Sequence, residues 1–344
     1  MTGRRTFSAT SQAAGTVSQS MSLPKVYITR PLPSPAVERL ATRCDVKMRS
    51  EDAPLDPVQL TESCRDIEGL MATGVRVSED VIAQAPRLRV VANVGVGYDN
   101  IDVTACTRRS IPVTNTPDVL TETTADLAFA LLMAAPRRLV ECDRYVREGR
   151  WQYSKWDLLW GADIYGKTLG VYGMGRIGKA VARRARGFSM RVFYHDTVRA
   201  TPALERELGA QFVDRETLLR EADFLTLHVP LTAETEHLIG ARELAMLKPT
   251  AFLINAARGK CVDEAALVEA LESKRLAGAG LDVFEHEPHV HPGLLSMPNV
   301  VLAPHVGSAT GQTRLAMAVL AAENLLAALE GRRPPNLVNS EIYT

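Results

Sequence analysis

One glycine pattern constrains this chain more than any other feature. Gly173, Gly175 and Gly178 form a GxGxxG pattern, which follows the apolar run Leu169–Tyr172 and opens an amphipathic segment, Ile177–Gly187. The first glycine permits a tight turn, the second lets a pyrophosphate approach the backbone, and the third lets strand and helix pack closely. The following helix offers unpaired N–H groups to phosphates at its N-terminus. We therefore predict a dinucleotide-binding strand–turn–helix unit.

An acidic residue after the next strand indicates which dinucleotide binds. Asp196 lies 21 residues after Gly175, where a carboxylate accepts hydrogen bonds from ribose hydroxyls and repels a 2′-phosphate. This predicts NAD, with NADP as the alternative because Arg199 follows three residues later. A second glycine pair, Gly95 and Gly97, lacks the third glycine and a following helix. We interpret it as a loop that exposes backbone amides.

Strand-like and helix-like segments alternate along the chain in two series. Such alternation is typical of a parallel sheet covered on both faces, and six strands make a complete doubly wound dinucleotide domain. The first series has strands at Lys25–Thr29, Ile67–Ala72, Leu88–Val94 and Ile111–Val113, with helices at Pro35–Arg43 (capped by Ser34), Ser78–Gln84 and Val103–Arg109. The second has six strands, at Thr168–Tyr172, Met190–Tyr194, Phe224–His228, Ala251–Asn255, Gly280–Val283 and Val300–Ala303.

The helices around the second series define the predicted domains. A helical stretch from Glu122 to about Arg147 contains Pro136, which predicts a kink or a break. The final helix, Ala309–Glu330, is interpreted as returning to the first domain. We predict an α/β fold of two doubly wound parallel-sheet domains. A Rossmann NAD(P)-binding domain of residues 121–304 is inserted in a flavodoxin-like substrate domain of residues 23–120 and 305–344, after a disordered tail or targeting segment of residues 1–22.

Composition excludes several classes of partner. Forty basic residues balance forty acidic ones without a long basic run, so neither nucleic acid nor a membrane is expected as a partner. The longest apolar stretch, Leu127–Ala135, is too short to span a bilayer. Five scattered cysteines without a CxxC pair favour a reducing, cytoplasmic location. The histidine cluster at 286–291 is interrupted by Pro288, so we predict no metal site.

Three ionisable residues each follow a different strand of the second series. Arg258, Glu287 and His305 come after the strands that begin at 251, 280 and 300. Because parallel strands bind ligands at their carboxyl ends, these side chains are expected to converge on one crevice. Carbonyl reduction by a nicotinamide needs a proton donor and a cation for the substrate carboxylate. A histidine with a carboxylate partner supplies the first, and an arginine fork supplies the second.

These residues resemble a known family, the D-isomer-specific 2-hydroxyacid dehydrogenases, from about Lys25 to Asn339. The Arg/Glu/His spacing of 29 and then 18 residues is similar to the family's. The matching segments are Val96–Asp102, Gly173–Gly178, Asn255–Gly259, Gly280–Pro288 and Pro304–Ala309. Asn115–Thr121, Thr124–Asp126 and Gly307–Thr310 are most similar to the glyoxylate/hydroxypyruvate reductase branch.

The resemblance implies a role for each residue. Arg258 would bind the substrate carboxylate and carbonyl, while His305 would be the acid/base and Glu287 its partner. The amides of Val96 and Gly97 would hold the carboxylate from the other domain. The cofactor would contact Gly173, Gly175, Arg176, Ile177, Gly178, Asp196, Thr124, Ala256 and Asp282, the last at the nicotinamide carboxamide.

An aromatic pair raises the question of assembly. Trp156 and Trp160 resemble a paired-Trp segment that, in hydroxypyruvate reductases, reaches across a homodimer to the neighbouring substrate pocket. The alternative is an aromatic dimer interface without a role in the pocket. Either interpretation predicts a homodimer.

The predicted activity is NAD(P)H-dependent reduction of a small 2-ketoacid, glyoxylate or hydroxypyruvate, to the D-2-hydroxy acid. Formate dehydrogenases have Gln where Glu287 stands, and phosphite dehydrogenases have Lys where Val96 stands, so both branches are disfavoured. Two alternatives stay open: a broader 2-ketoacid or 2-ketogluconate reductase, and a non-enzymatic NAD-sensing protein similar to the corepressors that share the fold.

Overall fold

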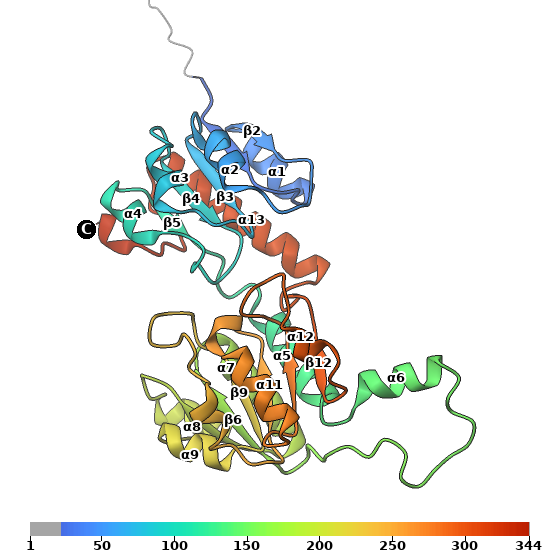
Figure 1. Cartoon of the computed structure of the whole chain (residues 1–344). Helices are drawn as coiled ribbons and strands as arrows, with labels where there is room; N and C mark the ends of the chain where they lie inside the picture. The colour runs from blue at the N-terminus through green and yellow to red at the C-terminus, as the bar shows by residue number, and fades with distance from the viewer. Residues whose placement is uncertain (1–21, 344) are drawn as a thin grey trace, which may run out of the picture.

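The computed structural model describes residues 22–343, which form two α/β domains joined side by side (Figure 1). The first contains a five-stranded parallel sheet in the order β2-β1-β3-β4-β5. Its strands are β1 (Lys25–Ile28), β2 (Asp45–Met48), β3 (Gly69–Ala72), β4 (Val90–Asn93) and β5 (Val113–Thr114). This order confirms the predicted flavodoxin-like topology. The sequence prediction missed β2, because this edge strand buries no side chain fully and has no apolar run.

Helices cover both faces of this first sheet, and alternate strand residues point to each face. Val26 and Ile28 pack under α1 and α13, whereas Tyr27 between them belongs to the cluster under α2, α3 and α4. The helices are α1 (Ser34–Ala41), α2 (Pro57–Cys64), α3 (Glu79–Ala83), α4 (Val103–Arg108) and α13 (Gly311–Leu329), and a 3-10 turn, Ser340–Tyr343, follows.

The second domain contains a seven-stranded parallel sheet in the order β12-β11-β10-β9-β6-β7-β8. Its strands are β6 (Thr168–Tyr172), β7 (Arg191–His195), β8 (Ala210–Phe212), β9 (Phe224–Leu227), β10 (Phe252–Asn255), β11 (Gly278–Leu281) and β12 (Val300–Leu302). If β6 is numbered 1, the strands from β8 across to β11 have the order 3-2-1-4-5-6, which is that of a dinucleotide-binding domain. The strand β12 is one further strand beside β11. The predicted Rossmann fold is confirmed. The strand count of six was wrong, because β8 has only three residues.

Two apolar clusters lie on the two faces of this sheet. One packs under α5 and α7 and the other under α9, α10 and α11. The helices are α5 (Thr121–Ala134), α6 (Leu139–Arg147), α7 (Arg176–Ala185), α8 (Pro202–Leu208), α9 (Arg215–Glu221), α10 (Ala241–Leu244), α11 (Glu264–Glu272) and α12 (Pro292–Leu295), with 3-10 turns at Arg186–Phe188 and Gly259–Cys261.

Two predictions about helix ends had different outcomes. The helix containing Pro136 does break, into α5 and α6, and Arg138 adopts a left-handed conformation with φ +50° at the break. The predicted cap by Ser34 is wrong, because that residue is already the first residue of α1 and its side chain makes no capping bond. Pro33 instead enters the helix with extended backbone (φ −56°, ψ 135°), which starts it one residue early.

The chain crosses between the domains twice. It leaves the first sheet after β5 to form α5, which packs on α7, and it returns after β12 to form α13, which packs on α1, β3 and β4. The domain limits given above stay predictions. The tail or targeting segment predicted for residues 1–22 lies outside the described residues except for Ser22. Within residues 22–343, no helix has the length and apolar character needed to cross a membrane.

Candidate active site

The glycine loop between β6 and α7 has the geometry of a phosphate-binding turn. Gly173 has φ +94°, and a Cβ there would lie 2.7 Å from the carbonyl oxygen of His228. A Cβ at Gly178 would lie 2.1 Å from the oxygen of Gly173, so helix and loop touch. At Gly175, the N-cap of α7, an added Cβ would meet nothing within 4 Å. The loop therefore has open space where a pyrophosphate would approach the helix N-terminus, which fits a dinucleotide.

Asp196 lies directly after β7, beside this loop. Its carboxylate accepts the N–H of Met174 at 2.6 Å and that of Val198 at 3.3 Å, which holds the acid against the glycine turn. Arg199, which sequence reasoning considered for a 2′-phosphate, donates from Nε and Nη2 to both oxygens of Glu205, at 2.9 and 3.0 Å. The arginine is thus already paired.

Sequence reasoning missed a buried histidine behind the glycine loop. His228 follows β9, and its Nε2 lies 2.9 Å from the hydroxyl of Thr226. Burial lowers the pKa of His228 to about 4, so the ring is neutral at physiological pH. The main-chain oxygen of His228 lies directly against Gly173, at the start of the glycine loop.

His305 and Glu287 form a hydrogen-bonded ionisable pair at the carboxyl edge of this sheet. Nδ1 of His305 lies 2.7 Å from Oε2 of Glu287, while Oε1 accepts the N–H of Phe284 at 3.0 Å. Because a carboxylate only accepts hydrogen bonds, Nδ1 carries a proton and Nε2 is left for a substrate. Burial raises the pKa of Glu287, but the hydrogen bond and charge of His305 outweigh it, so the pKa is lowered overall.

Asp282 holds the backbone of the loop that carries His305. This buried carboxylate accepts the N–H groups of Val306 at 2.7 Å and Gly307 at 2.8 Å. The N–H of His305 itself donates to the main-chain oxygen of Asp282 at 2.7 Å, and His305 is held with φ +53°. Burial raises the pKa of Asp282 despite the two amide donors. Asp282 thus positions the loop of His305, and its predicted contact with the nicotinamide stays a prediction.

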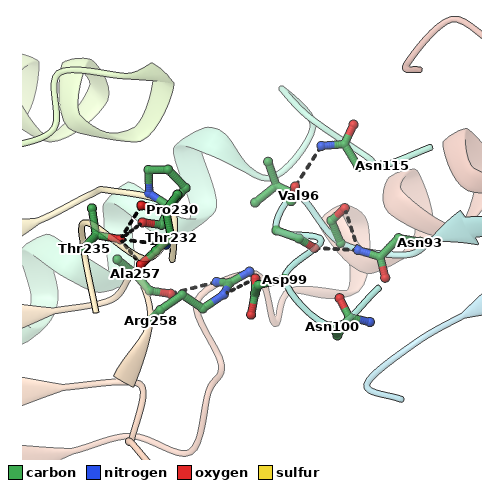
Figure 2. A network of polar contacts seen from close by, with 12 residues as sticks. Asn93, Val96, Asp99, Asn100, Asn115, Pro230, Thr232, Thr235, Ala257 and Arg258 are labelled. Carbon is green, nitrogen blue, oxygen red and sulfur yellow. Dashed lines mark hydrogen bonds and ion pairs between the residues drawn. The ribbon is translucent and has the colours of Figure 1, made fainter. Parts of the chain in front are cut away.

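Arg258 joins the two domains at the same edge. Its Nε donates to Oδ1 of Asp99 at 2.8 Å, across from the first domain (Figure 2). The contact with Gly97 is so close that an added Cβ would lie 1.4 Å from Nη2 of Arg258. Sequence reasoning quoted Asp99 within a matching segment but gave it no role. An acid two residues after a predicted amide loop was the available signal.

The amide loop that contains Val96 and Gly97 is held by two asparagines. The side-chain nitrogen of Asn93 donates to the carbonyl of Gly97 at 2.6 Å, and that of Asn115 donates to the carbonyl of Val96 at 2.8 Å (Figure 2). These bonds occupy the loop's carbonyl groups. The predicted substrate loop and Arg258 are therefore brought together, from different domains.

The remaining predicted residues lie around this junction, with one exception. Arg176 forms an ion pair with Asp118 at 2.5 Å, and Thr124 lies beside Gly307, where an added Cβ would be 3.3 Å from the threonine methyl. Ile177 packs with the clusters of both domains, and Ala256 is buried directly after β10. The exception is Trp156, which is 92% exposed on the segment between α6 and β6.

Within residues 22–343, no group of three or more His, Cys, Asp or Glu side chains could hold a metal ion. His291 instead caps α12, where its Nδ1 accepts the N–H of Gly293 at 3.2 Å. All five cysteines are free, and four of them are buried.

The chain is similar in sequence to known dehydrogenases and reductases. Residues 129–307 match the sequence model of the family described as D-isomer specific 2-hydroxyacid dehydrogenase, NAD binding domain. The chain is 51% identical to a glyoxylate reductase of Korarchaeum cryptofilum over 324 residues, which cover 93% of this chain and 97% of the relative.

Solved structures with the same fold include two reductases. A glyoxylate reductase from Paecilomyes thermophila has a TM-score of 0.85 at 34% identity, covering 93% of this chain and all of the other. An NADPH-dependent glyoxylate/hydroxypyruvate reductase from Sinorhizobium meliloti, in complex with NADP and malonate, has a TM-score of 0.82 at 38% identity, covering 92% and 97% of the two chains.

Proposed function

The chain belongs to the D-isomer specific 2-hydroxyacid dehydrogenases, a family of NAD(P)-dependent oxidoreductases, and we propose that it reduces glyoxylate and hydroxypyruvate to the corresponding D-2-hydroxy acids. One observation carries the proposal: the 2.7 Å pair of His305 and Glu287 lies at the edge where Arg258 meets the amide loop of the other domain. Relatives named glyoxylate reductase, at about half identity over nearly the full chain, support the choice of substrate.

Each residue of the site has a chemical task. When bound, the reduced nicotinamide supplies the hydride for the keto carbon. Arg258 binds the substrate carboxylate with its planar fork and polarises the carbonyl, together with the N–H groups of Val96 and Gly97. His305 donates the Nε2 proton to the keto oxygen as the alcohol forms, and Glu287 stabilises the imidazolium before that transfer.

The cofactor preference follows from the surroundings of the ribose. We propose NAD over NADP, because the Asp196 carboxylate lies beside the glycine loop and repels a 2′-phosphate. Arg199, the nearest candidate to bind such a phosphate, is engaged by Glu205. NADP is the alternative, since one relative is named an NADPH-dependent enzyme.

A substrate panel tests both proposals. The initial rates of NADH and NADPH oxidation are measured with glyoxylate, hydroxypyruvate, pyruvate and 2-ketogluconate, in the wild type and in Arg258→Ala. Among these four substrates, the proposal expects the highest kcat/KM with glyoxylate or hydroxypyruvate and NADH, and a large loss in the variant. A preference for 2-ketogluconate would favour the broader reductase. No turnover with any substrate, together with intact NAD binding, would favour a sensor.

We propose a homodimer built on the segment that contains α6. Leu139, Val140, Val146, Trp151 and Trp156 are all at least 49% exposed there, an unusual concentration of apolar surface. Within such a dimer, Trp156 either reaches the partner's substrate site or only packs in the interface. Sedimentation of the wild type and of Trp156→Ser, paired with KM for glyoxylate, separates assembly from substrate contact.

The five free cysteines support a reducing, cytoplasmic location.

A further inference from the structure

Two arginines outside the trio lie where the domains meet. Arg30 follows β1 at the carboxyl edge of the first sheet, and Arg314 lies in the first turn of α13, nine residues after His305. The Arg314 guanidinium is half-buried, yet it forms no hydrogen bond or ion pair with any residue in the described part of the chain. Burial lowers its pKa, as does the positive charge of Arg30, while Asp282 raises it. Arg314 therefore senses charges of both domains, yet it forms no ion pair within residues 22–343.

Arg30 forms only a weak ion pair, with Asp52. Its Nε lies 3.2 Å from Oδ1 of Asp52, a carboxylate that is 72% exposed, and pairs of this kind contribute little. The guanidinium lies over Gly74, where an added Cβ would be 3.6 Å from Nη1. Beside it, the hydroxyl of Thr73 is buried without a partner among residues 22–343. A buried hydroxyl without a partner and an uncompensated arginine are both features of sites that bind a polar ligand.

The first sheet places Arg30 at the same edge as the loop against which Arg258 packs. Arg30 follows β1, Gly74 follows β3, and Gly97, against which Arg258 packs, follows β4. Neighbouring strands are spaced about 4.8 Å apart, so the main-chain ends of β1 and β4 lie only two strands apart on the same edge of the sheet. A small ligand with an anionic group at each end could therefore face Arg258 with one group and Arg30 and Arg314 with the other.

We propose that Arg30 and Arg314 form a distal anion subsite, which makes 2-ketoacids with a second carboxylate the preferred substrates of this enzyme. The inference rests on the proposed function. Arg258 binds the first carboxylate, the keto carbon gains the hydride of NADH, and the keto oxygen gains the proton of His305, leaving NAD⁺ and the hydroxy dicarboxylate. Glyoxylate, with no second carboxylate, uses only the Arg258 side of the site.

Inhibitor binding tests the subsite without relying on turnover of a dicarboxylate. Malonate and acetate are compared as inhibitors of glyoxylate reduction, and as ligands that raise the melting temperature of the protein in the presence of NAD⁺. A hydrogen-bonded ion pair at the distal end is expected to make malonate bind at least about tenfold more tightly than acetate. Arg314→Met and Arg30→Met should reduce this ratio, whereas Arg333→Met, at an exposed arginine beyond α13, serves as the matched control.

Turnover gives the second readout. The wild type should reduce ketomalonate with a higher kcat/KM than glyoxylate, because the second carboxylate gains a partner at the distal arginines. In Arg314→Met, kcat/KM for ketomalonate should fall at least about tenfold further than kcat/KM for glyoxylate. Arg314→Lys, which keeps the charge, should recover part of the difference.

The outcomes separate the two proposals. If the wild type reduces glyoxylate but binds malonate no better than acetate, the distal subsite is overturned and the proposed function stands. An equal loss toward both substrates in Arg314→Met also overturns it, because the arginine would then support the fold or the first carboxylate. If malonate raises the melting temperature in an Arg314-dependent way but no ketoacid is reduced, the subsite stands and the proposed function fails.

Discussion

The contact between Gly97 and Arg258 offers a direct test of how the substrate site is assembled. In Gly97→Ala, the new methyl group would lie 1.4 Å from Nη2 and 2.5 Å from Cζ of Arg258, so the guanidinium has to move. The backbone itself need not change, because Gly97 does not have positive φ. The substitution therefore displaces one functional side chain and leaves the rest of the loop, including its bonds from Asn93 and Asn115, in place.

The expected effects on stability and on catalysis differ in size. Displacing Arg258 breaks its partly exposed ion pair with Asp99, which costs about 0–1 kcal/mol of folding free energy. The same displacement removes hydrogen bonds to the substrate carboxylate, each worth about 1.5–3 kcal/mol. A loss of about 3 kcal/mol in transition-state binding lowers kcat/KM roughly 100-fold.

Steady-state oxidation of NADH with glyoxylate, combined with urea unfolding, measures both quantities on the same preparation. Gly187→Ala is the matched control, because a Cβ at Gly187 would meet nothing within 4 Å and the residue lies far from the trio in the chain. Near-wild-type kcat/KM in Gly97→Ala would refute the reasoning, since it would mean that Arg258 binds the substrate from another position. A large loss of stability would likewise contradict the assignment of the contact to a flexible side chain.

Two further substitutions test the carboxylates around His305. Glu287→Gln should lower kcat/KM about ten- to a hundredfold, because the amide does not stabilise the imidazolium. Since the pKa of Glu287 is lowered in the folded protein, the stability difference from wild type should be present at pH 7 and disappear only as the pH falls below the ordinary value of 4.5, as urea unfolding across pH will measure. Asp282→Asn should cost about 1–3 kcal/mol, because one N–H of Val306 or Gly307 loses its acceptor; unchanged unfolding would contradict the role of Asp282 in holding the loop.

Local patterns in the sequence predicted much of the fold. The glycine pattern, the buried strands and the proline break between α5 and α6 are each encoded within a few residues. The polar edge strand β2 and the three-residue strand β8 were missed, because their pairing depends on a neighbouring strand rather than on an apolar run of their own. The start of α1 was misjudged by one residue, because Pro33 rather than Ser34 sets the entry into the helix.

The candidate site was predictable where residues follow strands, and less so where partners come from a distant segment. Strand ends indicated that Arg258, Glu287 and His305 would lie at one edge. The partner of Arg258, Asp99, is 159 residues away in the chain and belongs to the other domain, so only the folded structure brings them together. For the same reason, the pair of Arg30 and Arg314 has no local signal, since the two residues come from opposite ends of the described chain.

The bonds around His305 have a consequence for how the reaction is timed. Both supports of the imidazole come from residues 282–287, so the histidine belongs mechanically to the nucleotide-binding domain, although α13 follows it closely in the chain. The amide loop at Val96 and Gly97 belongs to the other domain. Any opening of the junction therefore separates His305 and Arg258 from the backbone amides that would also hold the ketoacid carboxylate. A molecule with bound cofactor and an open junction has its proton donor in place but only part of its ketoacid site, so the reaction requires the two domains to come together.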